Sequence, residues 1–79
     1  MSKYKKLKQR IEQENVKTDI TYDEIKRYLK KNGYNLNRVK GSHHIFKNNK
    51  GEIINIPLHG DVVKFVYIKK IRDQITKEK

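Results

Sequence analysis

Cysteine and tryptophan are absent from the 79-residue chain, and proline and methionine occur once each. Without cysteine the chain has no disulfide framework, no thiolate nucleophile and no zinc site built on sulfur ligands. Long apolar runs are missing too, because no stretch approaches the roughly 18 apolar residues that a membrane span needs. Neither secretion nor membrane insertion is supported, so we expect a cytoplasmic protein with no membrane partner.

Basic residues dominate the charge: 20 Lys and Arg against 9 Asp and Glu give a net charge of +11 at pH 7 with histidine neutral. Only 34% of the residues are hydrophobic, and a chain this short buries only about 60% of the surface that its unfolded form exposes. We therefore expect one domain over residues 1–79. A positive field of this size attracts polyanions, above all nucleic acid, although a lysine-rich surface also serves solubility or meets an acidic protein partner.

Two helices are predicted in the first half of the chain. The first covers residues 2–15, where Tyr4, Leu7 and Ile11 form an apolar stripe too narrow to hold a helix together in water. We expect it to pack on the core as an N-terminal extension, residues 1–17, of a core domain over residues 21–77. The second follows a connector over residues 15–20; it starts with a capping box of Thr21 and Glu24 and stops at residues 32–33, Asn-Gly.

The second half predicts three strands and a last helix. A period of two marks strands over residues 34–40, 43–48 and 52–57, joined by hairpin turns. Helical spacing favours a helix over residues 62–77, although its first residues also have strand propensity. The residues expected on its buried face are Val63, Val66, Tyr67, Ile71 and Ile75. The fold class is α+β, a three-stranded antiparallel sheet packed against helices in the order α-α-β-β-β-α.

Histidines are the candidates for chemistry, because no other side chain here exchanges protons near neutral pH. Neighbouring residues of a strand point to opposite faces, so if His44 and Phe46 face the helices, His43 and Lys47 share the exposed face. A histidine there can take the proton of an RNA 2′-hydroxyl while a lysine offsets charge on the attacked phosphate, without a metal.

The turn before His43 consists of Gly41 and Ser42. Glycine lets the backbone approach a phosphate closely and serine can donate a hydrogen bond beside it, although such a pair is more commonly a plain turn. A metal site is the alternative for the histidines, with His43 or His44, His59 and Asp61 as ligands. We favour Asp61 as the N-cap of the last helix, and so expect no metal and no cofactor.

The run Lys40-Gly41-Ser42-His43-His44-Ile45-Phe46 resembles the HicA, or YcfA-like, toxins of bacterial and archaeal toxin–antitoxin systems, and residues 38–43 resemble the central signature of that family. Residues 21–34 resemble the opening helix of the family and its Gly-aromatic end. Residues 54–57, followed by His59, resemble its third strand and loop, and residues 66–75 are similar to its last helix. The likeness covers most of the chain.

The resemblance implies a fold like that of double-stranded RNA-binding domains, ribonuclease activity against mRNA that halts translation, and a HicB-type antitoxin that blocks the active face. It places the catalytic histidine, a general acid or base, at His43. We expect the RNA-binding residues to be Arg38, Lys40, Gly41, Ser42 and Lys47. Two other hypotheses stay open: a non-catalytic RNA-binding module of the same fold, and a protein whose basic face chiefly docks an acidic partner.

Overall fold

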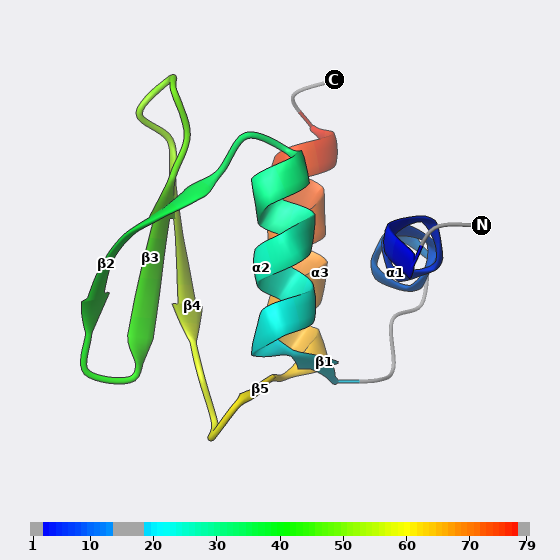
Figure 1. Cartoon of the computed structure of the whole chain (residues 1–79), viewed down its shortest axis with the longest axis horizontal. Coiled ribbons are helices and arrows are strands. Elements are labelled where there is room, and N and C mark those ends of the chain that lie inside the picture. The colour runs from blue at the N-terminus through cyan, green and yellow to red at the C-terminus, as the bar shows by residue number, and fades with distance from the viewer. Residues whose placement is uncertain (1–2, 14–18, 78–79) are drawn as a thin grey trace.

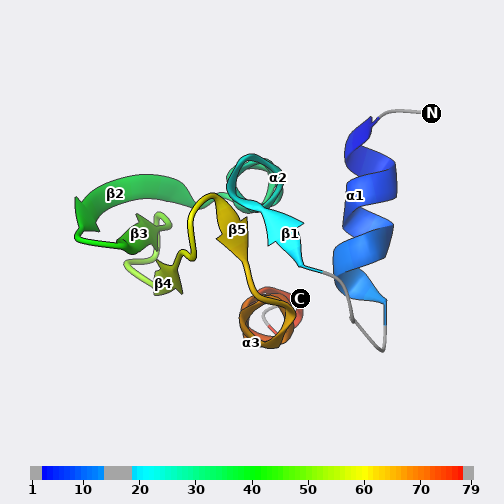
Figure 2. The ribbon, with the colours of Figure 1, turned by 90° about the horizontal axis from the view of Figure 1, so that it is seen from below.

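A sheet, a pair of helices and one further helix lie in three successive layers in the computed structural model, which describes residues 3–13 and 19–77 (Figures 1 and 2). The sheet has the antiparallel order β2-β3-β4, formed by β2 (Asn35–Lys40), β3 (His43–Lys47) and β4 (Ile53–Pro57). One of its faces is covered by α2 (Tyr22–Lys31) and α3 (Phe65–Thr76). On the far side of these two helices lies α1 (Lys3–Glu12). The predicted α+β class and three-stranded sheet are confirmed.

The start and end of α2 follow from local sequence signals. Thr21 and Glu24 form the predicted capping box: the Thr21 hydroxyl accepts from the Glu24 backbone N–H at 3.2 Å, and the Glu24 carboxylate accepts from the Thr21 N–H at 3.1 Å. The helix ends before Gly33, whose φ of 87° takes the chain out of the helix. Its apolar face then lies in the core, as predicted.

The first helix belongs to the same core as the rest of the fold. Leu7 and Ile11 are buried, which confirms the predicted packing of this helix, while residues 2, 14 and 15 of the predicted helix lie outside the described residues. The Tyr28 hydroxyl donates to the Glu12 carboxylate at 2.8 Å, and Arg10 pairs with Glu24 at 2.7 Å. These contacts fix α1 across α2.

Two short strands were missed by the sequence prediction. The first, β1 (Ile20–Thr21), begins at the end of the predicted connector, and the second, β5 (Val62–Val63), lies where the last helix was predicted to start. The two strands pair antiparallel. The prediction that residues 62–64 are helical is therefore wrong. Ile20 and Val63 are fully buried opposite each other, and that pairing joins segments far apart in the sequence, which the local period cannot reveal.

The N-cap of α3 also differs from the prediction. The helix starts at Phe65, and the capping residue is Lys64, whose side chain makes no cap hydrogen bond. The carboxylate of Asp19 accepts from the Phe65 backbone N–H at 3.1 Å instead. Asp61 does not cap α3, because it lies directly before β5. Its backbone carbonyl accepts a hydrogen bond from the Tyr22 N–H at 2.8 Å.

The buried face of α3 is shifted from the predicted one. Ile71 and Ile75 are buried as expected, but Ile68 completes the face and Val66 is 50% exposed. The expectation for Val66 is wrong, because a helix that begins at Phe65 and buries residues 68, 71 and 75 turns position 66 toward solvent. The helix packs its isoleucines into the core shared with the sheet and α1.

Candidate functional site

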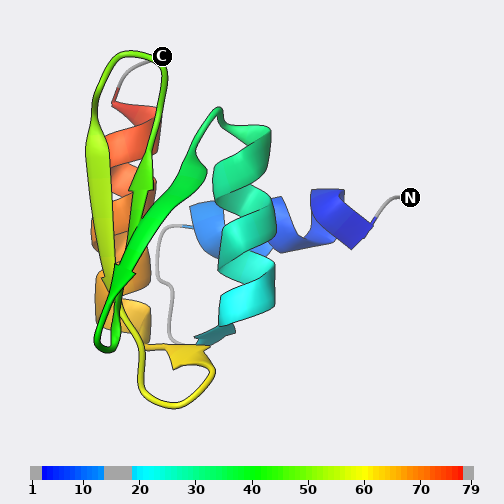
Figure 3. The ribbon, with the colours of Figure 1, turned by 60° about the vertical axis from the view of Figure 1, so that its left-hand side comes forward.

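One face of the sheet points away from the helices (Figure 3), and the strand register places predicted site residues on it. Opposed residues of antiparallel strands lie on the same face, so the register defines its three rows. We call this surface the outer face; its rows are Lys40, His43 and Pro57, then Arg38, Ile45 and Asn55, then Asn35, Lys47 and Ile53. Seven of the nine residues are exposed, while Pro57 is half-buried and Ile45, in the centre, is 9% exposed.

His43 stands at the start of β3, exposed, in register with Lys40 on one side and Pro57 on the other. Its Nδ1 atom lies 3.1 Å from Oδ1 of Asn55, on the neighbouring strand. Sequence reasoning did not select Asn55. A signal existed, because Asn55 is a polar residue between Ile54 and Ile56, and alternation places it on the face opposite to these two buried side chains.

The outer face is positively charged. Arg38, Lys40 and Lys47 are exposed there, and no residue of the three rows is acidic. Within residues 3–13 and 19–77, none of these three cations forms an ion pair with a carboxylate. Lys40 is the nearest to His43 by register, Arg38 is one row away and Lys47 two rows away. The arrangement offers a proton-exchanging group within a field that favours anions.

The turn that precedes His43 is a two-residue hairpin loop, since Lys40 and His43 are paired. Gly41 has a φ of 61°, and no heavy atom beyond its two chain neighbours lies within 4 Å of the place where a Cβ would stand. The carbonyl of Ser42 accepts from the Leu58 N–H at 3.0 Å, which fixes the turn to the loop after β4. Gly41 and Ser42 therefore present open backbone at the end of the outer face.

His44 faces the opposite way from His43, as alternation predicted, and belongs to the packing between sheet and helices. Its ring centroid lies 4.6 Å from that of Tyr22, the first residue of α2. The His44 Nδ1 atom is buried and has no hydrogen-bond partner among the described residues. Burial and the nearby Asp23 charge raise the pKa of Tyr22, so its phenol stays protonated at neutral pH.

The third histidine is separate from this surface. His59 lies in the loop after β4, where its backbone bridges Val62. The metal alternative joined it to Asp61 and to His43 or His44. In the part of the chain that the structure describes, no three His, Cys, Asp or Glu side chains converge as ligands would. None of the described helices is long and apolar enough to cross a bilayer.

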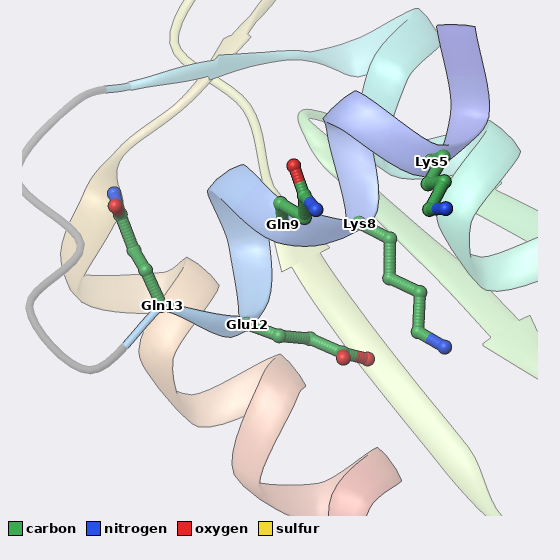
Figure 4. Close-up of a pocket in the computed structure, with 5 residues that line it drawn as sticks. All are labelled: Lys5, Lys8, Gln9, Glu12 and Gln13. Carbon is green, nitrogen blue, oxygen red and sulfur yellow. The ribbon is translucent and has the colours of Figure 1, made fainter. Parts of the chain in front are cut away.

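Two shallow depressions lie on helices, away from the outer face. The one in Figure 4 is lined by residues of α1 and the residue after it, on the opposite side of α2 and α3 from the sheet: Lys5, Lys8, Gln9, Glu12 and Gln13. The other lies on α2 and is lined by Asp23, Lys26, Arg27 and Lys30. Neither contains a histidine or a residue of the outer face. The residues of the candidate site lie on an exposed surface, which suits an extended polymer better than a small ligand.

Comparison with protein families shows which family the chain resembles. The family described as "HicA toxin of bacterial toxin-antitoxin" matches residues 22–76, more than half of the chain. The chain belongs to the HicA toxin family. HicA proteins are the toxin components of toxin–antitoxin systems, and membership implies a HicB-type antitoxin as partner.

The HicA match runs from α2 to the end of α3 and includes the whole outer face, whereas α1 precedes it. Comparison with curated proteins and with solved structures found no match. The likeness to double-stranded RNA-binding domains therefore stays a prediction.

Proposed function

We propose that this HicA protein is a single-domain toxin that cuts mRNA in the cytoplasm as a metal-independent endoribonuclease, with His43 as its catalytic residue. The observation that carries the proposal is the register pair Lys40 and His43, two exposed residues on adjacent strands of a face whose rows contain no carboxylate. An acid–base group beside a cation is what phosphodiester cleavage needs. Membership of a toxin family supports an activity that harms the cell, such as the cleavage of mRNA.

The proposed reaction uses the ribose of the substrate as its nucleophile. The 2′-hydroxyl gives its proton to the His43 imidazole while the 2′-oxygen forms a bond to the adjacent phosphorus. The bond from phosphorus to the 5′-oxygen of the next nucleotide breaks, and that oxygen takes a proton from water. The His43 imidazolium then gives its proton to the hydroxide that is left, which restores the neutral ring. The products are a 2′,3′-cyclic phosphate and a free 5′-hydroxyl, and the negative charge that builds up on the phosphate oxygens is offset by Lys40.

The other predicted residues would hold the RNA. Arg38 and Lys47 lie one and two rows from His43, so the three cations follow the length of the sheet as a backbone of phosphates would. The open backbone at Gly41 and Ser42 lets a phosphate approach next to the reacting group. A HicB-type antitoxin would neutralise the toxin by covering this same face.

The test is cleavage of a long single-stranded RNA in EDTA by the wild type, by His43→Ala and by His59→Ala, an exposed histidine outside the outer face. We expect the wild type and His59→Ala to cut and His43→Ala to leave the RNA intact. A strand of the same sequence built with 2′-deoxyribose should stay intact with all three proteins, because it lacks the 2′-hydroxyl that acts as nucleophile. Retarded but intact RNA with the wild type would contradict the proposal and favour the non-catalytic RNA-binding module.

Phosphate binding is tested by salt dependence. Replacing Lys40 and Lys47 together by Glu should weaken RNA binding and lower the slope of log affinity against log salt by about 0.7 for each lost single-strand phosphate contact. The matched control replaces Lys3 and Lys6 of α1, both exposed, by Glu and changes the net charge equally. Equal losses in both variants would show that net charge alone, and not the outer face, attracts RNA.

A further inference from the structure

Asn55 is an unfavourable residue for its position in the sheet, and its exposed side chain adds little to the packing. It lies within β4 between the buried Ile54 and Ile56, with its own side chain exposed on the outer face. Asparagine is disfavoured in strands, where a β-branched residue such as Val or Thr would fit better. Among the described residues, the only hydrogen-bond partner of its side chain is the His43 ring.

We infer that Asn55 is a positioning residue for His43, which keeps the ring proton on Nδ1 and leaves Nε2 free to accept the proton of the substrate. The geometry is the 3.1 Å contact between the Asn55 amide oxygen and Nδ1. An amide oxygen only accepts, so the nitrogen facing it carries the proton, and in a neutral imidazole the other nitrogen is then unprotonated. The contact also fixes the rotation of a ring that is otherwise exposed.

The role of Nε2 in cleavage rests on the proposed function, but the control of the tautomer does not. The charged groups around His43 on the outer face are Lys40 on β2, Arg38 on β2 and Lys47 on β3 itself, and none of them is a hydrogen-bond acceptor. Asn55 is therefore the group on this face that the structure provides to select the tautomer.

The test compares the His43 ring nitrogens by ¹⁵N NMR at a pH where the ring is neutral, in the wild type, in Asn55→Val and in Asn35→Val. Valine suits a strand, so the variant at position 55 stays folded, and Asn35 is a matched exposed asparagine on the outer face two rows from His43. A His43→Ala spectrum assigns the signals. We expect protonated Nδ1 in the wild type and in Asn55→Asp, and a gain of protonated Nε2 in Asn55→Val alone.

Cleavage rates give the second readout. Asn55→Val should cut about threefold to tenfold more slowly, the effect of one hydrogen bond. The control for the rate is Asn37→Val, at an exposed asparagine of β2 that belongs to none of the three rows, and it should cut at the wild-type rate. In Asn55→Asp the acid limb of the pH–rate profile should move to higher pH, because a carboxylate favours the charged imidazole.

Protonated Nε2 in the wild type, or the same tautomer in the wild type and Asn55→Val, would overturn the inference, because the amide would then donate to the ring or play no part in its protonation. These outcomes differ from failure of the proposed function. If the wild type does not cut RNA, the tautomer spectra still decide whether Asn55 controls His43. If His43→Ala loses cleavage and the spectra of Asn55→Val are unchanged, the proposed function stands and the inference fails.

Discussion

His43 and His44 are neighbours in the sequence and have opposite situations in the fold. His43 is exposed on the outer face beside Asn55 and Lys40, whereas His44 packs against Tyr22 in the layer between sheet and helices. Across the sheet, the cations of β2 and β3 lie on the outer face, and the apolar side chains buried on the opposite, inner face are those of Phe46, Ile54 and Ile56. Because successive side chains of a strand point to opposite faces, two neighbouring residues can lie one on the candidate site and one in the packing that stabilises the fold.

The largest effect expected is on the inner face. Phe46→Ala should lower the free energy of unfolding by about 3–5 kcal/mol, because a fully packed aromatic ring leaves a cavity behind. The control is Ile53→Ala on the outer face, whose side chain is 55% exposed and whose loss should cost no more than about 0.5 kcal/mol. Chemical denaturation measures both; similar losses at the two positions would remove the distinction between the faces.

On the outer face the effect should be kinetic and not structural. His43→Ala is expected to slow single-turnover RNA cleavage at least about 100-fold, the lower end of what a general acid or base contributes. Its thermal unfolding should match the wild type, since His43 is exposed. A fall in both rate and melting temperature would mean that His43 is part of the packing.

Removing a contact between α1 and α2 should lower stability without affecting cleavage, as on the inner face, but by a smaller amount. Burial, then the hydrogen bond to Glu12, raise the pKa of Tyr28 well above its ordinary value, so the hydroxyl remains a donor throughout the neutral range. Tyr28→Phe should cost about 1 kcal/mol of unfolding free energy, with little change between pH 6 and 9, and leave cleavage unaltered. Reduced cleavage in this variant at full folding would show that α1 communicates with the outer face.

The smallest effect concerns the acid range. Desolvation alone would raise the pKa of Glu24, but hydrogen bonds from Thr21 and Arg10 outweigh it and lower the pKa. The stability that this carboxylate contributes is thus present above its unfolded pKa of about 4.5 and is lost as the pH falls through the lower folded value. Glu24→Gln keeps a capping side chain, so it should cost at most about 1 kcal/mol at pH 7 and nothing below the folded pKa.

Denaturation from pH 7 to pH 2 checks this prediction, and Arg10→Gln is the matched control. Once Arg10 is absent, Glu24→Gln should have a smaller effect at pH 7, because the ion pair is already lost. If the loss of unfolding free energy in Glu24→Gln grew as the pH fell, the predicted direction of the pH dependence would be wrong.

Much of the fold could be predicted where the signal lies within a few residues. The Thr21 capping box, the stop at Gly33 and the two-residue turn between Lys40 and His43 depend on neighbouring backbone groups and side chains. Alternation along β3 likewise assigned His43 and His44 to opposite faces. Each of these is a local property that a short segment already possesses before the chain folds.

The errors all involve partners distant in the sequence. Val62–Val63 had the spacing of a helix and the propensity of a strand, and only pairing with Ile20–Thr21 decided between them. The cap of α3 came from Asp19 instead of Asp61, because the start of β1 lies beside the start of α3 in the fold. Once the helix began at Phe65, its buried face included Ile68 and excluded Val66.

By itself, the sequence determined the three helices and the three strands of the main sheet, the basic charge and the position of the candidate catalytic histidine, because periodicity, capping and the Gly-Ser-His run are carried by adjacent residues. Tertiary structure alone decided which residues of different strands share a surface: it brought Asn55 to within hydrogen-bonding distance of His43 and placed Arg38 and Lys40 on the same face as Lys47. The reason is physical, since strand register sets distances between side chains that the chain connects only through turns, and local propensity carries no information about that register.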